Sequence, residues 1–166
     1  AFKPQLDEVV FSAETALNRI AKYLDSDMEK YPEDGEGDVY GIVVHAYIAK
    51  YVGKLFDGSI PYERMDRRVF RVIWEQKKVM LQRIKMIEDS LEMNNEISEK
   101  YKRLVAEADM MRMLYASHYM RRRDAVLPII QKKLLTLMKN EKELLTMLVE
   151  KAGKEQNDES LEVSQE

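Results

Sequence analysis

One group of arginines is spaced as a row of phosphate-binding side chains would be. Its four members follow one another at i, i+3, i+4 and i+7: Arg64, Arg67, Arg68 and Arg71. On a helix this spacing places four guanidinium groups on one side. Because guanidinium groups neutralise phosphates and hydrogen-bond their oxygens, these arginines are candidate contacts for a nucleic acid or for an acidic protein partner.

A second group ends the stretch HYMRRR, which begins at His118: Arg121, Arg122 and Arg123. Consecutive residues advance about 100° around a helix, so these three side chains cannot share one face. We expect at least one to serve the interior or an interface, and the others to contact carboxylates or phosphates. The neighbouring acids Asp66 and Asp124 reduce the net positive charge of the two arginine groups. Solvated or ion-paired faces therefore remain the simplest interpretation of both groups.

Residue types that support catalysis or metal binding are scarce. The chain has two histidines, His45 and His118, and no cysteine, and neither histidine has the neighbours of a helical metal motif. The loop EDGEGD has glycines, but its acids would repel a phosphate, and their spacing does not match a calcium loop. No Gly-x-Ser-x-Gly nucleophile motif is present. We predict a protein that is not an enzyme and that uses no cofactor, metal or small-molecule substrate.

Composition and charge favour long amphipathic helices. Of the 166 residues, 45% are apolar and 34% are charged, a mixture typical of helical proteins. Residues 1–62 carry 6 basic and 11 acidic side chains, residues 63–139 carry 18 and 11, and residues 140–166 carry 3 and 8. The basic middle favours an acidic partner or pairing with the acidic ends within the fold. No signal sequence or membrane-spanning run is apparent, so we expect a soluble cytoplasmic protein without a membrane partner.

Glycine and proline divide the chain into expected helices. Five of the six glycines lie before residue 59, and none occurs between residues 59 and 152. Apolar periodicity predicts a first helix over residues 6–28 and a second over residues 39–56, separated by an acidic loop. Pro61 lies in the first turn of a third helix, which we expect over residues 62–91. Its predicted apolar seam contains Val69, Ile73, Met80, Ile84, Ile87 and Leu91, with Gln76 in the remaining place.

The fourth helix, from residue 97, has three heptads in strict register. Its seam residues are Ile97, Tyr101, Leu104, Ala108, Met111, Tyr115 and His118. We expect it to fold back on the third helix as an antiparallel, coiled-coil-like hairpin. A second set of apolar residues lies off this seam: Val105, Met110, Met113, Leu114 and Met120. Such a helix needs neighbours on two faces, from the fold or from another subunit. Our candidate interface residues are Met111, Tyr115, His118 and Tyr119.

The C-terminal region is predicted to contain shorter helices. We expect Pro128 to kink or interrupt the chain, and Asn140 to cap a new helix that stops at Gly153. The polar residues 154–166 are predicted to be a disordered tail. The result is an all-α fold with a single domain over residues 1–153. Residues 1–58 supply its N-terminal two-helix part, and residues 59–153 supply the hairpin and the C-terminal helices.

The stretch EADMMRMLYASHYMRRRDAVLPII, followed by NEKELLTMLVEKAGK, resembles the helical domain of GINS replication subunits over residues 107–154. The resemblance rests on an apolar helix with Tyr115 and Tyr119, on Arg121 and Arg123 in an Arg-x-Arg group, and on the apolar helix that follows. It implies a non-catalytic subunit that holds a replicative helicase assembly together. GINS subunits usually add a small β-rich domain, for which this chain has no candidate.

The sequence therefore predicts a helical assembly or adaptor subunit of an intracellular complex, which self-associates or binds another protein. A direct nucleic-acid-binding accessory protein, such as a viral packaging or recombination factor, is the alternative. Steep salt dependence of binding would favour that alternative.

Overall fold

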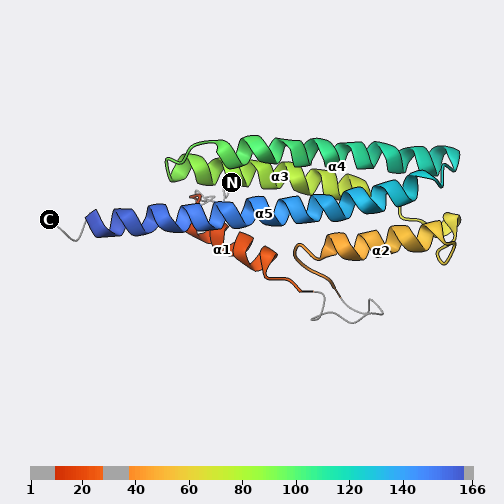
Figure 1. Cartoon of the computed structure of the whole chain (residues 1–166), viewed down its shortest axis with the longest axis horizontal. Helices are drawn as coiled ribbons and strands as arrows, with labels where there is room; N and C mark the ends of the chain where they lie inside the picture. The colour runs from red at the N-terminus through yellow and green to blue at the C-terminus, as the bar shows by residue number, and fades with distance from the viewer. Residues whose placement is uncertain (1–9, 28–37, 163–166) are drawn as a thin grey trace, which may run out of the picture.

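The computed structural model describes residues 10–27 and 38–162, and their side chains as far as Asn157. The described residues contain no strand, and their helices are α1 (Ala13–Leu24), α2 (Val44–Phe56), α3 (Val69–Ser90), α4 (Glu96–Arg121) and α5 (Val126–Glu162) (Figure 1). A short 3₁₀ turn, Tyr62–Arg64, lies between α2 and α3. The predicted all-α class is confirmed.

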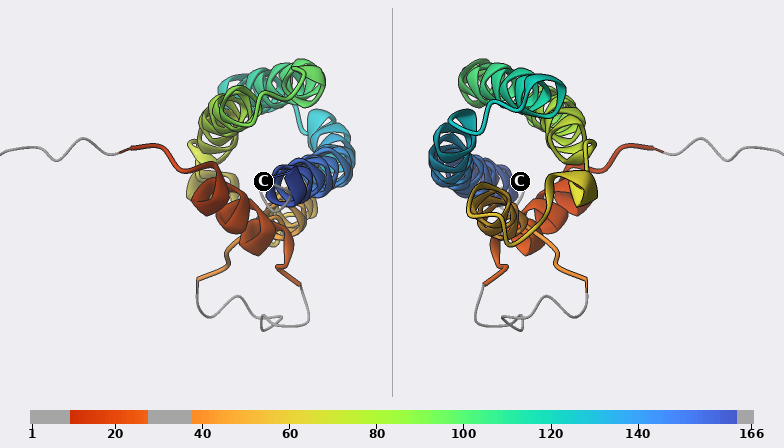
Figure 2. Two further views of the ribbon diagram at one scale, coloured as in Figure 1. Left: turned by 90° about the vertical axis from the view of Figure 1, so that its left-hand side faces the viewer. Right: turned by 90° about the vertical axis from the view of Figure 1, so that its right-hand side faces the viewer.

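The five helices form an elongated bundle with four sides. α3, α4 and α5 each occupy one side, while α1 and α2 follow one another along the fourth (Figures 1 and 2). α3 and α4 run in opposite directions and are joined by the short link that follows Ser90. α5 packs against α4 and α2, and α1 lies against both α5 and α3. The fourth side is therefore made of two separate helices, with a discontinuity between the end of α1 and the start of α2.

Heptad spacing explains which faces of the long helices are buried. All seven predicted seam residues of α4 are buried, so that prediction is confirmed. In α3 the predicted seam residues Ile73, Met80, Ile84 and Ile87 are buried, whereas Val69 and Leu91 are half-buried. The observed seam passes through Phe70 and Lys77 at the remaining core positions. The prediction that Gln76 fills the remaining place is wrong: Gln76 is exposed, and Lys77 is fully buried. A lysine therefore occupies a position that the pattern reserves for an apolar side chain.

The predicted starts of the first three helices are too early. α1 begins at Ala13, because the Ser12 side chain caps it by accepting a hydrogen bond from the Thr15 amide at 3.2 Å. Residues 6–9 and residue 28 of the predicted first helix lie outside the described residues. α2 begins only at Val44, after Gly41 adopts a left-handed φ of 83°. α3 begins at Val69, because the backbone is extended at Met65 and residues 67–68 form a turn.

The C-terminal half differs most from prediction, because α5 is one continuous helix. Pro128 is its third residue, where a missing amide hydrogen costs no intrahelical bond, so the expected interruption does not occur. Asn140 lies in the interior of α5 instead of capping a new helix, and the helix passes through Gly153. Of the predicted disordered tail, residues 154–162 belong to α5, and residues 163–166 lie outside the described residues.

Candidate functional site

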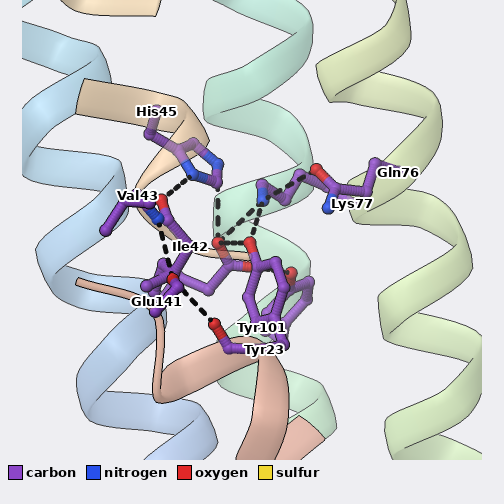
Figure 3. A network of polar contacts seen from close by, with 9 residues as sticks. Tyr23, Ile42, Val43, His45, Gln76, Lys77, Tyr101 and Glu141 are labelled. Carbon is purple, nitrogen blue, oxygen red and sulfur yellow. Dashed lines mark hydrogen bonds and ion pairs between the residues drawn. The ribbon is translucent and has the colours of Figure 1, made fainter. Parts of the chain in front are cut away.

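A buried ion pair lies at the centre of the bundle. Lys77 of α3 and Glu141 of α5 are both fully buried, and Lys77 Nζ is 2.7 Å from Glu141 Oε2 (Figure 3). Both residues continue the apolar seams of their helices, which turns the two side chains toward each other. Their charges are removed from water, so each depends on the other for compensation.

Three further helices contribute side chains to this pair (Figure 3). Tyr23 of α1 donates a hydrogen bond to Glu141 Oε2 at 3.0 Å, and Tyr101 of α4 donates one to Oε1 at 2.5 Å. His45 of α2 places Nε2 3.6 Å from Glu141 Oε2. All five helices therefore meet at a single carboxylate, beside the break between α1 and α2. We call these five side chains, Tyr23, His45, Lys77, Tyr101 and Glu141, the polar network.

The environment of the polar network fixes its protonation at neutral pH. Burial alone would raise the pKa of Glu141. The charge of Lys77 and the hydrogen bonds that Glu141 accepts from Lys77 and Tyr101 outweigh burial, so the pKa of Glu141 lies below its usual value. Burial lowers the pKa of Lys77, against the opposing effect of Glu141. Burial and the charge of Lys77 together lower the pKa of His45 to about 4. Because Lys77 Nζ lies 2.7 Å from the Glu141 carboxylate, we interpret the two as a charged pair beside a neutral imidazole.

Hydrogen bonding assigns the tautomer of His45. Its Nδ1 lies 2.7 Å from the carbonyl oxygen of Ile42, so the neutral ring carries its proton on Nδ1 and donates it there. Nε2 is then unprotonated, and it has no hydrogen-bond partner among the described residues. Burial, followed by Glu141, raises the pKa of the Tyr23 and Tyr101 hydroxyls, so both remain donors at neutral pH.

The polar network has residue types suited to acid–base chemistry, but its geometry favours a structural role. Its two ionised groups are fully buried and bond to each other and to neighbouring hydroxyls. A groove of about 810 Å³ between α1 and α3 comes close to it, and Tyr23 is the member of the network that lines the groove. We interpret the network as a polar core that fixes the relative positions of the five helices.

A second buried carboxylate joins α3 to α4. Glu88 near the end of α3 is fully buried, and its Oε1 accepts a hydrogen bond from the backbone amide of Ser98 at 3.0 Å. Ser98 lies in the first turn of α4, where amides lack helical partners and negative charge is favoured. Glu88 therefore supplies the N-terminal cap of α4 from the neighbouring helix.

The structure brings the two arginine groups to the same end of the bundle. The Tyr62 hydroxyl donates to the backbone oxygen of Tyr119, and the Tyr115 hydroxyl donates to that of Asp66 at 2.7 Å. These bonds hold the turn before α3 against the end of α4. The predicted helical row does not exist, however, because the segment from Arg64 to Arg68 precedes α3 and only Arg71 lies in it.

Several arginines in these groups already have partners. Arg68 pairs with Asp66 at 3.1 Å and Arg71 with Glu75 at 3.0 Å. Arg122 adopts a left-handed φ of 51°, where it ends α4. Its guanidinium lies 4.1 Å from the ring centre of Tyr62 and 3.1 Å from the Glu63 carboxylate. Arg67 lies over the Tyr119 ring at 5.4 Å. Three arginines of these groups are exposed and have neither an ion pair nor an aromatic contact among the described residues: Arg64, Arg121 and Arg123.

The predicted interface residues are mostly internal. Met111, Tyr115 and His118 are buried in the bundle, and Tyr119 is half-buried. Met111 and Tyr115 belong to the apolar core, with Tyr115 against Phe70 at a ring distance of 4.8 Å. His118 packs edge-on against Tyr62 at 5.6 Å. In the folded bundle Met111, Tyr115 and His118 are therefore not accessible to a partner.

The accessible apolar face of α4 lies on its opposite side. Met110, Met113 and Met120 are 44%, 54% and 72% exposed. Their spacing places them within an arc of about 80° on the helix. We call these three residues the methionine face. Val105 and Leu114, from the same predicted second set, are half-buried against the core instead.

Comparisons with known proteins give no relative: no family model, no curated protein and no solved structure matches the chain. Within residues 10–27 and 38–162, no group of histidines and carboxylates is arranged to hold a metal ion. Over the same residues, no helix combines the length and apolar character needed to cross a bilayer.

Proposed function

We propose that the protein is a non-enzymatic assembly or adaptor subunit of an intracellular, cytoplasmic multiprotein complex, and that it binds its partner through the methionine face of α4. The carrying observation is the exposure of Met110, Met113 and Met120 on a helix whose other face is already buried. Clustered exposed apolar side chains are a common property of protein-binding surfaces. Methionine suits such surfaces, because its flexible thioether adapts to a partner's shape.

The closed core supports this assignment. Each long helix buries a complete seam, and the central charges are compensated within the bundle. The methionine face is therefore not required to complete the fold of a single chain. A partner or a second copy that covers these residues would remove apolar surface from water at about 25 cal/mol per Å².

The resemblance to GINS subunits gives this proposal a more specific form. In that form, the protein holds a replicative helicase assembly together during DNA replication. The residues that carry the resemblance lie on α4, on α5 and in the link between them, with Tyr115 internal and Arg121 and Arg123 exposed at the bundle end. The expected partners would then be subunits of the replication machinery.

Glutamates introduced on the methionine face test the proposal. We expect the variant Met113→Glu/Met120→Glu to fold normally but to lose its partner, because charge replaces apolar contact at the centre of the interface. The measurement is affinity purification of tagged protein from its native cells, combined with light scattering to detect self-association. The control is Val72→Glu, which alters an apolar residue of α3 that is 60% exposed.

A partner or second copy that is bound in stoichiometric amount by the wild type and by Val72→Glu, but not by the double variant, supports the proposal. A protein that stays monomeric and has no stoichiometric partner contradicts it. Equal binding by wild type and double variant would show that any partner uses another surface.

Nucleic-acid binding is a second candidate function, and the convergence of the two arginine groups favours it. Arg64, Arg121 and Arg123 have no competing ion pair among the described residues, and the bundle end brings them together from distant parts of the sequence. If each neutralises one phosphate, raising the salt concentration from about 50 to about 200 mM should weaken duplex binding about 40-fold.

Fluorescence anisotropy with a labelled DNA duplex measures this effect. We expect Arg64→Glu/Arg121→Glu/Arg123→Glu to abolish binding and Lys132→Glu/Lys133→Glu to have little effect, because these lysines lie elsewhere, in the groove between α4 and α5. No binding at low salt, or equal binding by the triple-arginine variant, would rule out this candidate.

A further inference from the structure

A groove between α4 and α5 extends the methionine face. Its volume is about 680 Å³, and its apolar lining includes Ala106 and Met110 of α4 and Ile129 of α5. Ile129 is 49% exposed, although it is a large aliphatic residue. Met110 belongs both to the groove and to the methionine face, so one partner could cover the two surfaces together. Nothing in the described part of the chain covers them.

Positive charge borders this apolar floor. Arg103, Lys132 and Lys133 line the groove, and Glu107 is its acidic lining residue. Glu107 is already engaged, because Arg103 Nε lies 3.1 Å from its Oε1. Lys132 and Lys133 have no ion pair among the described residues. Residues 126–140 of α5 contain three lysines and no acid, so the α5 side of the groove is uniformly basic.

The charge distribution discriminates between possible occupants. A second copy bound through the same groove in a twofold arrangement would bring two sets of Lys132 and Lys133 into one interface without adding new acidic partners for them, which disfavours association. An acidic partner compensates Lys132 and Lys133. The shape is informative too, because the groove between two packed helices receives the side-chain ridge of a third. Apolar anchors on one face of the partner and carboxylates on the other would match the floor and the rim.

We propose that the groove between α4 and α5 binds an acidic amphipathic helix of a partner protein. This inference rests on the proposed adaptor function and specifies the partner's chemistry. Apolar side chains of that helix lie on Met110 and Ile129, and its carboxylates pair with Lys132 and Lys133. Binding weakens as salt rises, because the rim pairs are exposed to solvent.

A synthetic peptide tests the inference directly. The probe is a labelled helical peptide of about 16 residues, roughly four turns, with leucines on one face and glutamates on the other. A matched peptide replaces every glutamate by lysine. We expect the acidic peptide to bind the full chain, and the lysine peptide to bind at least about tenfold more weakly.

Variants of α5 locate the binding surface. Lys132→Glu/Lys133→Glu should lower the affinity for the acidic peptide by about tenfold or more. The control Lys139→Glu/Lys142→Glu makes the same charge change on the same helix, but at residues that line a different groove, and it should leave binding within about twofold of wild type. Thermal unfolding of both variants verifies that each remains folded.

Three results would overturn the inference: failure of the acidic peptide to bind, equal loss of binding in the control variant, or a dimer in solution that Lys132→Glu/Lys133→Glu dissociates. If the acidic peptide does not bind but Met113→Glu/Met120→Glu abolishes binding of the native partner, the adaptor function stands and only the proposed partner chemistry is wrong. If both experiments fail, the adaptor function falls with it.

Discussion

Glu141→Leu is expected to destabilise the folded protein by about 3–5 kcal/mol, because it leaves the Lys77 ammonium buried without its counter-charge. It also removes the acceptor of the Tyr23 and Tyr101 hydroxyls. Urea unfolding at pH 7, monitored by circular dichroism and by the fluorescence of the single tryptophan, measures the change. Leu at position 141 continues the apolar seam of α5, so the loss reports on charge and hydrogen bonding more than on packing.

A double-variant cycle separates the ion pair from other effects. Lys77→Met alone is also expected to be strongly destabilising, whereas Lys77→Met/Glu141→Leu should be less destabilised than the sum of the two single changes by at least about 2 kcal/mol. Glu143→Leu is the matched control on the same helix. Glu143 is exposed, so we expect a change within about 0.5 kcal/mol. Additive single effects would mean that Lys77 and Glu141 do not stabilise each other.

Acidification is expected to destabilise the fold through His45. The folded-state pKa of His45 is about 4, below the ordinary value of 6.5, so the unfolded chain binds the proton more tightly. The contribution of His45 is therefore fully present above pH 6.5 and is lost as the pH falls toward 4. A shift of this size corresponds to a loss on the order of 3 kcal/mol. Glu141 lies 3.6 Å from His45 and can also be protonated in acid. Because the pKa of Glu141 is lowered, its contribution to the pH dependence of stability falls at more acidic pH than that of His45.

Urea unfolding at a series of pH values between 7 and 4 measures this effect. The control is His45→Asn, whose side-chain amide can donate to the Ile42 carbonyl in place of Nδ1 but does not titrate. We expect the control to have a much flatter stability profile over this interval. If the wild type and His45→Asn lose stability in parallel, the acid sensitivity comes from other groups.

Periodicity was sufficient to predict the fold class and the buried face of α4. Every position of the α4 seam from Ile97 to His118 obeys alternating steps of three and four, and all are buried. For α3 the same rule was applied one residue out of register around Lys77. A lysine in a heptad core position does not look like a core residue, because burying an ammonium is favourable only when a counter-charge meets it. That counter-charge is 64 residues away in the sequence.

Glu141 was missed for a related reason. Asn140 followed by Glu143 resembles a helix start. This pattern predicts a break between two helices at the place where the continuous α5 carries its buried carboxylate. Tertiary packing outweighs the local capping preference. α5 continues through this point because it buries apolar residues on both sides of it, from Leu137 to Leu145. A seam extended across residue 141 would have placed this glutamate in the core.

The candidate binding surfaces were predictable only in part. Apolar residues on a second face of α4 were evident from the sequence, but only the structure separates the exposed Met110, Met113 and Met120 from the half-buried Val105 and Leu114. The prediction of a helical row of four arginines is wrong, because the chain is extended at Met65 and turns at residues 67–68 before α3 starts at Val69. Hydrogen bonds from tyrosines to distant backbone oxygens fix that turn, and no sequence spacing encodes them.

Methionine oxidation footprinting tests most directly whether the methionine face is the partner-binding surface. Peroxide treatment of the isolated protein and of its assembly purified from native cells, followed by mass spectrometry, compares each methionine in the two states. Met110, Met113 and Met120 should oxidise readily in the isolated chain and be protected in the assembly. Met86, which is 45% exposed on α3, is the internal comparison, and the buried Met111 should react slowly in both states. If the three methionines of α4 oxidise as fast in the assembly as in isolation, the methionine face is not the interface.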